Sequence, residues 1–550
     1  MLLLAACAKQ GMPSGGPKDE TPPQVLRMRP DNRTLQRDKG EFAIDFDEYV
    51  VIKDAENNIL VSPPMTQKPE YKTRGKSLVV RVQDTLQPNT TYVFQMKDAI
   101  ADYNEGNLLP SLEYVFSTGA YIDSMTVRGR VVEALTHEAN TEAMSVWLYT
   151  PDDYEQMLRS LTDTAIRCPQ PCYTTRCDKD GTFSLNYLRG GTYRCLAIAD
   201  EDKNLVVGPT EAVAFLDSAV VALGMKDSVA LDSTHRYCQA DSQRVALHYY
   251  TPRTAQQRIA SSGFKGRGRV ELASLLPMTD PHVDAGGEAV IWRLNAKRDT
   301  MTLWTLHERC DSLRLIVTDT SGLHDTLRLR YTHGRSLPQK GGGTPSAGIK
   351  LNYNKLPYYD TLRFTFTTPL DTARCPSDSV VRIMDLRDSS LAYCPVRIDS
   401  SLLRADIVYP FRAGAKYEID IPRNRLYNIW NRGTDTLHAV VTVTEPEEYG
   451  TLNLAVVADV QQPLVVQLLD EKGATLREQR LDGSGTLQFP HLLPAKYRLR
   501  AIVDANANGQ WDGGDLKQQQ QPERVVYMRK VLDIRANWEY NEQLTIATSD

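Results

Sequence analysis

Apolar and polar side chains alternate along most of this chain, with a period of two residues. In residues 41–46 the alternation places three apolar side chains on one side of an extended backbone, namely Phe42, Ile44 and Phe46. Such alternation is typical of strands that bury one face. Residues 290–306 and 313–331 each contain two alternating segments around a polar turn, so we expect two hairpins there. Helical periodicity is confined to one short segment, residues 152–161.

The chain contains a close internal duplication, which indicates a repeated sandwich. Residues 181–204 align without gaps with residues 485–508. The matched pairs are Gly181/Gly485, Leu188/Leu492, Tyr193/Tyr497, Ala197/Ala501, Ile198/Ile502 and Asp200/Asp504.

A second, looser repeat relates the segment that begins at Asp84 to the segment that begins at Tyr409. Tyr92 and Tyr417 each follow a turn and lead into an alternating strand. Ig-type sandwiches commonly fix such a turn with a tyrosine corner, in which the phenol bonds to backbone a few residues upstream. We therefore expect two tyrosine corners.

A chain of 550 residues is too long for one core, and its short strands with Asp, Gly, Pro and Asn turns indicate sandwiches. With the duplications, the pattern predicts an all-β fold of serial β-sandwich units in the order A-B-C-A-B. The predicted units are unit 1 (type A, 22–119), unit 2 (type B, 120–235), unit 3 (type C, 236–335), unit 4 (type A, 347–447) and unit 5 (type B, 448–546). Residues 336–348 contain three consecutive glycines, and we expect this linker to let the two halves move.

The first residues carry a candidate lipidation signal. Leu4-Ala5-Ala6-Cys7 resembles the lipobox of bacterial lipoproteins, in which the cysteine is lipidated and becomes the mature N-terminus. The alternative is a chance match in an apolar N-terminus. The rest of residues 1–21 is rich in Gly, Pro, Ser and Lys, and this composition suits a flexible tether between a lipid anchor and a folded body.

Unit 1 carries "TPPQVLRMRPDN", "FDEYV", "LQPNTTYVFQMKDAIADYNEGN" and "YVFSTG". These segments resemble the bacterial Ig-like domain of the S-layer type, as it occurs in Bacteroidota lipoproteins. There a similar tether follows the lipidated cysteine, which here reads "CAKQGMPSGGPKDETPP". The resemblance implies a lipoprotein of the outer membrane or cell envelope with an extended β body, and it supplies no catalytic residues.

Unit 2 carries "GRVVEA", "VWLY" and "DKDGTFSLNYLRGGTYRCLAIAD". It resembles the transthyretin-like or carboxypeptidase-regulatory-like sandwich, and unit 5 repeats the pattern. The resemblance implies a spacer or partner-docking module. Type C matches neither pattern and stays unassigned.

The stretch "DANANGQWDGGD" in unit 5 has the spacing of a calcium loop. Calcium takes six to eight oxygen ligands, and here acidic and amide side chains alternate before a glycine at position six. The predicted ligands are Asp504, Asn506, Asn508, Gln510, Asp512 and Asp515. The alternative is an Asx-rich turn, in which Asp and Asn bond their own backbone. In the first copy Leu205 replaces the glycine, so we expect a plain turn there.

Composition and motifs give no reason to expect an enzyme. The net charge of −5 and the pI of about 6.1 give no reason to propose nucleic acid as a partner. His137-Glu138 and His307-Glu308 lack the second histidine of a zinc protease motif, and the chain has no nucleophile elbow or P-loop. Histidine lies near cysteine at His235/Cys238 and His307/Cys310 only, and both pairs fit ordinary strand positions.

Eight cysteines besides Cys7 fit an exported protein, although their pairing cannot be deduced from spacing. We expect at least two disulfides among them and buried thiols for the rest. These cysteines are Cys168, Cys172, Cys177, Cys195, Cys238, Cys310, Cys375 and Cys394.

The sequence therefore favours a non-catalytic outer-membrane lipoprotein, a scaffold or accessory subunit that touches other envelope proteins. The alternative is a glycan- or nutrient-binding surface lipoprotein, which would need an aromatic platform beside polar groups. The six tryptophans are dispersed, and we expect them to be core or loop anchors. They are Trp147, Trp292, Trp304, Trp430, Trp511 and Trp538.

Overall fold

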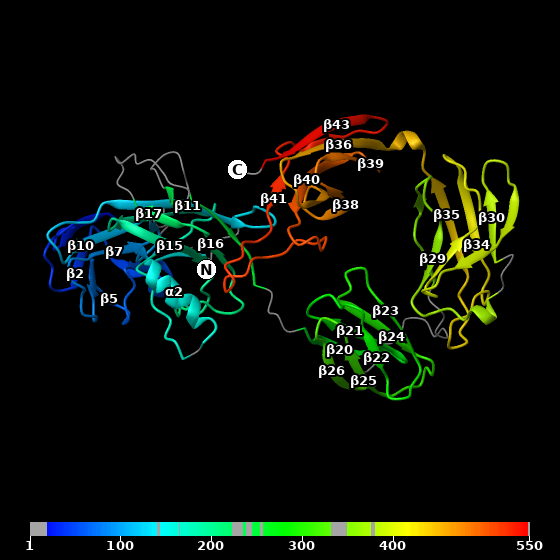
Figure 1. The fold of residues 1–550 in the computed structure, drawn as a ribbon, viewed down its shortest axis with the longest axis horizontal. Helices are drawn as coiled ribbons and strands as arrows, with labels where there is room; N and C mark the ends of the chain where they lie inside the picture. Colours follow the sequence, from blue (N-terminus) through cyan, green and yellow to red (C-terminus); the bar gives the residue numbers. More distant parts are fainter. Residues whose placement is uncertain are drawn as a thin grey trace, which may run out of the picture.

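The computed structural model describes residues 19–139, 144–163, 165–222, 235–237, 245–252, 257–331, 349–375 and 380–547. Strands dominate these residues and pair into successive β-sandwiches, which confirms the predicted all-β fold class (Figure 1). The predicted helix is present as α2 (Pro151–Ser160). Thr150 caps it by accepting a hydrogen bond from the backbone N–H of Asp153, and Pro151 occupies its first turn. A second helix is a single turn, α1 (Ala55–Asn58).

Unit 1 consists of two main sheets and a small third one. The strand orders are β1-β2-β6-β5, β10-β7-β4 and β3-β8-β9. Phe42 stacks on Tyr114 between the two main sheets, with ring centroids 3.9 Å apart. The strands are β1 (Val25–Arg29), β2 (Phe42–Phe46), β3 (Val50–Ile52), β4 (Ile59–Ser62), β5 (Glu70–Arg74), β6 (Ser77–Arg81), β7 (Thr91–Met96), β8 (Ile100–Asp102), β9 (Leu108–Leu109) and β10 (Leu112–Ser117).

Unit 2 pairs the sheet β14-β11-β19 with a sheet around β12 and β15. The predicted boundary at residues 235/236 is wrong, because β19 runs parallel to β11 and buries Val245 and Leu247 in the core of unit 2. Unit 2 therefore extends to Tyr250. The strands are β11 (Met125–Glu133), β12 (Ser145–Tyr149), β13 (Tyr173–Arg176), β14 (Thr182–Leu188), β15 (Gly191–Ile198), β16 (Val213–Phe215), β17 (Ala219–Ala222), β18 (His235–Tyr237) and β19 (Val245–Tyr249).

Unit 3 is a smaller sandwich with strand orders β20-β21-β24-β23 and β22-β25-β26. Both predicted hairpins are confirmed, as β23 pairs antiparallel with β24 and β25 with β26. The strands are β20 (Ile259–Gly266), β21 (Arg269–Ser274), β22 (His282–Asp284), β23 (Val290–Leu294), β24 (Thr300–Thr305), β25 (Ser312–Thr318) and β26 (His324–Arg330).

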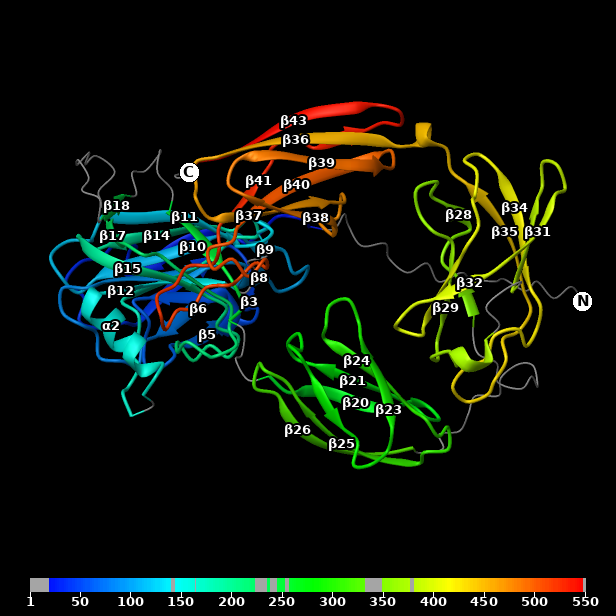
Figure 2. The ribbon, with the colours of Figure 1, turned by 45° about the vertical axis from the view of Figure 1, so that its right-hand side comes forward.

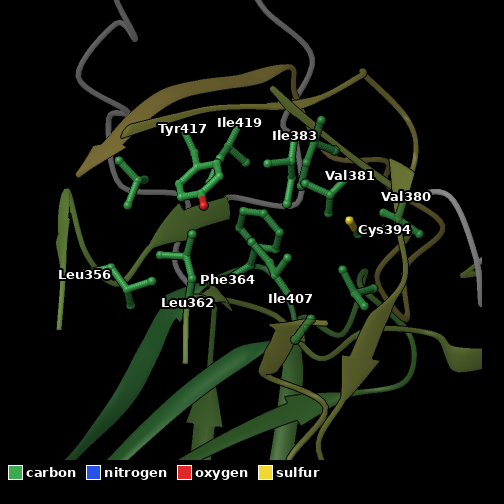
Figure 3. Packing of buried hydrophobic residues seen from close by; sticks show 14 of the residues in the cluster. Leu356, Leu362, Phe364, Val380, Val381, Ile383, Cys394, Ile407, Tyr417 and Ile419 are labelled. Carbon is green, nitrogen blue, oxygen red and sulfur yellow. The ribbon is translucent and has the colours of Figure 1, made fainter. Parts of the chain in front are cut away.

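Unit 4 has strand orders β27-β29-β33-β32 and β28-β35-β34-β30-β31. Figure 3 shows its core, where Phe364 and Tyr417 lie among aliphatic side chains from both sheets. The strands are β27 (Ile349–Leu351), β28 (Lys355–Leu356), β29 (Arg363–Phe366), β30 (Val381–Asp385), β31 (Leu391–Cys394), β32 (Val396–Ile398), β33 (Arg404–Ile407), β34 (Lys416–Ile421) and β35 (Leu437–Val443).

Both tyrosine corners are confirmed. The Tyr92 hydroxyl accepts a hydrogen bond from the backbone N–H of Gln87 at 2.8 Å. The Tyr417 hydroxyl accepts one from the N–H of Arg412 at 3.0 Å. Each bond reaches back five residues, so units 1 and 4 fix the same turn in the same way.

Unit 5 repeats the topology of unit 2. Its sheets are β39-β36-β43, in which β43 runs parallel to β36, and β38-β37-β40-β41, with β42 also paired to β40. The strands are β36 (Gly450–Ala458), β37 (Pro463–Leu469), β38 (Thr475–Asp482), β39 (Gly485–Leu492), β40 (Ala495–Val503), β41 (Val525–Tyr527), β42 (Leu532–Ile534) and β43 (Glu539–Ile546).

Specific contacts fasten units 3 and 4, although the glycine-rich linker lies between them in the sequence. The indole N–H of Trp304 donates to the Thr367 carbonyl oxygen at 3.1 Å. The indole N–H of Trp430 donates to the Thr305 carbonyl oxygen at 2.9 Å. The expectation of two halves that move about this linker is thereby corrected, because the sandwiches on its two sides share a junction.

The neighbouring junctions are also built from side chains. Units 1 and 2 are joined by an ion pair of 2.7 Å between Lys97 and Asp178. Units 4 and 5 are joined by Tyr359, whose ring stacks on His491 with centroids 3.9 Å apart. Unit 5 thus lies between unit 2 and unit 4, and unit 3 lies beside unit 4 (Figures 1 and 2).

Candidate functional site at the junction of the repeated sandwiches

Units 2 and 5 pack against each other through the segment of unit 5 that follows β40. In β15 and β40 the alternation breaks, and the residues of 195–198 and 499–503 are all buried. A strand that is buried on both faces needs a second covering layer. In unit 2 that layer is helix α2 together with the long turn of unit 5 that runs from β40 to β41.

Leu516 is the apolar anchor of this turn. It is 6% exposed and belongs to a cluster of unit 2 side chains that includes Trp147, Tyr149 and Tyr154. The turn approaches unit 2 closely at Gly514, where an added Cβ would lie 2.6 Å from Cε1 of Tyr250. Since real Cβ atoms do not come so near, the approach requires a glycine.

Polar contacts surround the anchor. The side-chain amide of Gln521 donates to the Phe215 carbonyl oxygen at 3.0 Å and to Asp217 at 2.7 Å. From β41, which follows the turn, the Tyr527 hydroxyl donates to the Leu135 carbonyl oxygen at 3.0 Å. The turn therefore satisfies backbone groups of unit 2 as well as burying apolar surface.

A cavity of about 460 Å³ lies in the junction. His137 and His248 line it from unit 2, and Glu523 and Arg524 line it from unit 5. The two imidazole centroids are 5.4 Å apart, and the ring of His137 also lies 5.2 Å from that of Tyr527. Burial lowers the pKa of both histidines from the ordinary value of 6.5.

The predicted calcium loop forms the first part of this turn. Asp504 is 2% exposed, and its carboxylate accepts the N–H of Asn508 at 3.1 Å and that of Gly509 at 2.6 Å. Asp512 Oδ2 accepts the side-chain amides of Asn506 at 2.7 Å and Asn508 at 2.5 Å. The loop brings together Asp504, Asn506, Asn508 and Asp512, with Gly509 at a φ of +77°.

The remaining predicted ligands lie differently. Asp515 starts the next turn, where its Oδ1 accepts the N–H of Lys517 at 2.8 Å and of Gln518 at 3.2 Å. The side chain of Gln510 is exposed, while its N–H donates to Asn508 Oδ1 at 2.7 Å.

Glu523 joins the loop although the sequence reasoning missed it. Its carboxylate accepts the N–H of Ala505 at 2.8 Å and of Asp512 at 3.0 Å. Burial, and then the nearby Asp512 and Asp504, raise the pKa of Glu523. The available signal was the repeat itself, because Glu523 precedes β41 by two residues, as Glu211 precedes β16 in the first copy.

The first copy forms the turn predicted for it, and carboxylates gather beside that turn. Asp200 accepts the N–H of Asn204 at 3.1 Å and of Leu205 at 3.2 Å, as in an Asx-rich turn. In addition, carboxylate oxygens of Asp200, Asp202 and Glu211 lie within 4.8 Å of one another. Burial is the largest cause of a raised pKa at Asp200.

The cysteine prediction requires a correction. The seven described cysteines of the sandwiches form no disulfides with one another, so the expected pairs are not found in this part of the chain. Several occupy separate cores: Cys177 and Cys195 lie in unit 2 and Cys394 in unit 4. Cys310 Sγ donates to the Ser312 carbonyl oxygen, and burial raises the pKa of this thiol, which opposes thiolate formation. Cys7, Cys238 and the side chain of His235 lie outside the described residues.

The tryptophans are mainly anchors, as expected. Trp147 and Trp304 are buried, Trp430 and Trp511 lie in junctions, and Trp292 packs on the core of unit 3. Trp538 differs, with 58% of its surface exposed.

A third polar group lies on the sheet of unit 4. Glu418, Asp420 and His438 have oxygen and nitrogen atoms within 4.8 Å of one another. Arg382 bonds to Asp420 at 2.5 Å, so the group already contains a cation. Within the described residues, no helix has the length and apolar character needed to cross a membrane.

Comparison with known proteins relates part of the chain to one domain family. No curated protein matches the chain. Among solved structures it is similar to BcpA, the major pilin subunit of Bacillus cereus, at 10% identity and a TM-score of 0.14, covering 77% of this chain and 98% of that one. It is also similar to SGBP-B of the Bacteroides ovatus mixed-linkage glucan utilization locus, at 10% identity and a TM-score of 0.20, covering 76% and 95%. Scores this low transfer neither arrangement nor function. Residues 19–118 match the family model of a bacterial Ig-like domain, which supports the Ig-like prediction for unit 1.

Proposed function

We propose that this protein is a non-catalytic lipoprotein of the cell envelope. Lipid on Cys7 would hold it to the outer membrane, and its sandwiches would act as a scaffold or accessory subunit through contacts with other envelope proteins. The single observation that supports this proposal most is the junction of units 2 and 5. There Leu516 and the polar contacts around it bring two distant repeats of the chain into one frame.

A frame of this kind suits a scaffold because its outer surfaces keep fixed relative positions. The ion pair of Lys97 with Asp178 and the stack of Tyr359 on His491 act in the same sense at the neighbouring junctions. Proteins that act by contact use exposed edges and loops held on such rigid supports. No catalytic step is needed for this role.

The direct test is crosslinking of the intact protein in its native membrane, followed by identification of the proteins that co-purify. Reproducible envelope partners support the scaffold, and recovery of the protein alone would contradict it. In parallel, metabolic labelling with an alkyne fatty acid tests the anchor. The wild type should carry the label and the Cys7→Ser variant should not, while Cys310→Ser is the matched control.

We also propose that the turn of unit 5 holds a structural calcium ion. Asp504, Asn506, Asn508 and Asp512 would supply oxygen ligands, with Glu523 in place of Asp515. Calcium prefers such carboxylate and amide oxygens. An ion there would stiffen the turn that carries Leu516 into unit 2.

A further inference from the structure

Unit 1 has an apolar patch on its smallest sheet. Val51, Ala101 and Leu108 are directly opposite one another in the register of β3, β8 and β9. The N–H of Tyr103 donates to the Tyr49 carbonyl oxygen at 2.9 Å, so the two tyrosines continue this pairing. Since side chains two apart on a strand share a face, all five lie on one side of the sheet.

This side of the sheet is open to solvent at its margins and covered at its middle strand, β8. Tyr49 is 59% exposed, Tyr103 69% and Leu108 42%, whereas Ala101 is fully covered. The opposite side packs on the core of unit 1 through Val50 and Ile100. Large apolar side chains gathered on an exposed face usually mark a contact site.

The patch lies where the N-terminal segment meets the sandwich. The side-chain amide of Asn107, adjacent to Leu108, donates to the carbonyl oxygens of Asp19 at 2.9 Å and Thr21 at 3.3 Å. Asp19 lies twelve residues after Cys7 in the sequence. Fully extended, this stretch spans at most about 40 Å. If Cys7 is lipidated, the bilayer surface is within that distance of the patch.

We propose that Tyr49, Val51, Tyr103 and Leu108 insert at the headgroup level of the membrane that holds the anchor. This inference rests on the lipid anchor of the proposed function. Tyrosine suits this depth, because its ring is apolar and its hydroxyl stays in contact with water.

The charges around the patch indicate which lipids it accepts. Lys76 lies over the ring of Tyr49 at 5.8 Å, and Lys53 bonds to the Gly106 carbonyl oxygen. The acidic residues outnumber these lysines, since Asp19, Asp47, Glu48 and Glu105 lie on the adjoining segments. A net negative rim favours zwitterionic over anionic lipid.

The test supplies the anchor artificially. The chain from residue 7, with Cys7→Ser and an N-terminal hexahistidine, is held on phosphatidylcholine–phosphatidylethanolamine vesicles by a nickel-chelating lipid. Hydrogen exchange of residues 49–52 and 100–109 should slow by about tenfold relative to the free protein, as expected for burial of a few apolar side chains. Residues 391–394, which carry the exposed Tyr393 in unit 4, should not change.

The double variant Tyr49→Ser, Tyr103→Ser should lose this protection, whereas Tyr393→Ser should keep it. Exchange that is equally fast with and without vesicles would overturn the inference. So would protection that depends on protein concentration without vesicles, which indicates a second copy, or protection that requires anionic lipid. Because the anchor is artificial, failure here does not bear on Cys7, and failure of fatty-acid labelling in cells does not bear on the patch.

Discussion

The carboxylate of Glu308 in unit 3 accepts two hydrogen bonds from the guanidinium of Arg432 in unit 4, at 3.1 Å from Nε and 2.5 Å from Nη2. Both side chains are about three-quarters buried. Bidentate pairs of this kind are strong and directional. The pair therefore fixes the angle between the two sandwiches.

A double-mutant cycle with Glu308→Ala and Arg432→Ala should therefore show coupling of about 1–2 kcal/mol in the free energy of unfolding. Lys68 and Glu56, which pair on the open surface of unit 1, serve as the control and should show little coupling. Equal coupling energies in the two cycles would mean that the Glu308–Arg432 pair stabilises the protein no more than an exposed ion pair does.

Removal of one hydroxyl should weaken each tyrosine corner. Tyr92→Phe and Tyr417→Phe each lose one backbone hydrogen bond while the ring remains in the core, so each should cost about 1 kcal/mol in thermal or denaturant unfolding. Tyr393→Phe, at an exposed position, should be neutral. If both variants are as stable as the wild type, the tyrosine hydrogen bonds do not stabilise these turns.

Leu516→Ala should loosen the contact between units 2 and 5. Truncation of a buried leucine to alanine costs about 2–5 kcal/mol. Because Leu516 lies between the two units, this loss should mainly reduce the free energy with which they dock. Small-angle X-ray scattering should show a larger radius of gyration, and Leu493→Ala, exposed on unit 5, should leave it unchanged. If both variants keep the wild-type radius, Leu516 does not anchor the junction.

The same junction should weaken in acid. Burial lowers the pKa of His137 and His248, so the separated units bind protons more readily than the docked ones. The contribution of the two rings is therefore complete above pH 6.5 and is lost as the pH falls below 6.5 and through the lowered pKa of the docked rings. Unfolding temperatures measured across this range should drop more for the wild type than for the double variant His137→Gln, His248→Gln, with His324→Gln as the control.

If the turn of unit 5 binds calcium as proposed, substitutions of Glu523 and Asp515 should affect metal binding differently. Trp511 donates its indole N–H to the Glu523 carbonyl oxygen at 3.0 Å, so it lies close enough to sensitise terbium luminescence. Glu523→Gln should weaken terbium binding about tenfold or more by removing a charged ligand. Asp515→Asn should leave terbium binding unchanged. If Asp515→Asn weakens binding and Glu523→Gln does not, Asp515 is the ligand, as the sequence spacing predicted. A chelator should lower the unfolding temperature of the wild type only.

The sequence predicted those features that depend on local pattern. Alternation at Phe42, Ile44 and Phe46 gave a strand with one buried face, and the turn before Tyr92 gave its corner. The docking of units 2 and 5 depends on contacts between residues hundreds of positions apart. Its signal was the loss of alternation at the ends of the two strands, where Ile198 and Ile502 each lie in a short apolar run, which indicates strands covered on both faces.

In the candidate loop, too, the local features were predicted from the sequence and the contact with a distant residue was not. The alternating side chains from Asp504 to Asn508 were predicted from spacing, whereas Glu523 enters from just before β41, outside that spacing, and is indicated only by its counterpart Glu211 in the first copy. Spacing also favoured Asp515, which folding places in its own turn. Ligand spacing carries over between loops only when the loop length does.

The spatial order of the sandwiches has a mechanical consequence. Because unit 5 docks on unit 2, a pull between the start of unit 1 and the end of unit 5 is transmitted through units 1, 2 and 5. Units 3 and 4 form a side loop that carries no tension until Leu516 is drawn out of unit 2. They are then a reserve of hidden length, and the junction sets the force at which it is released.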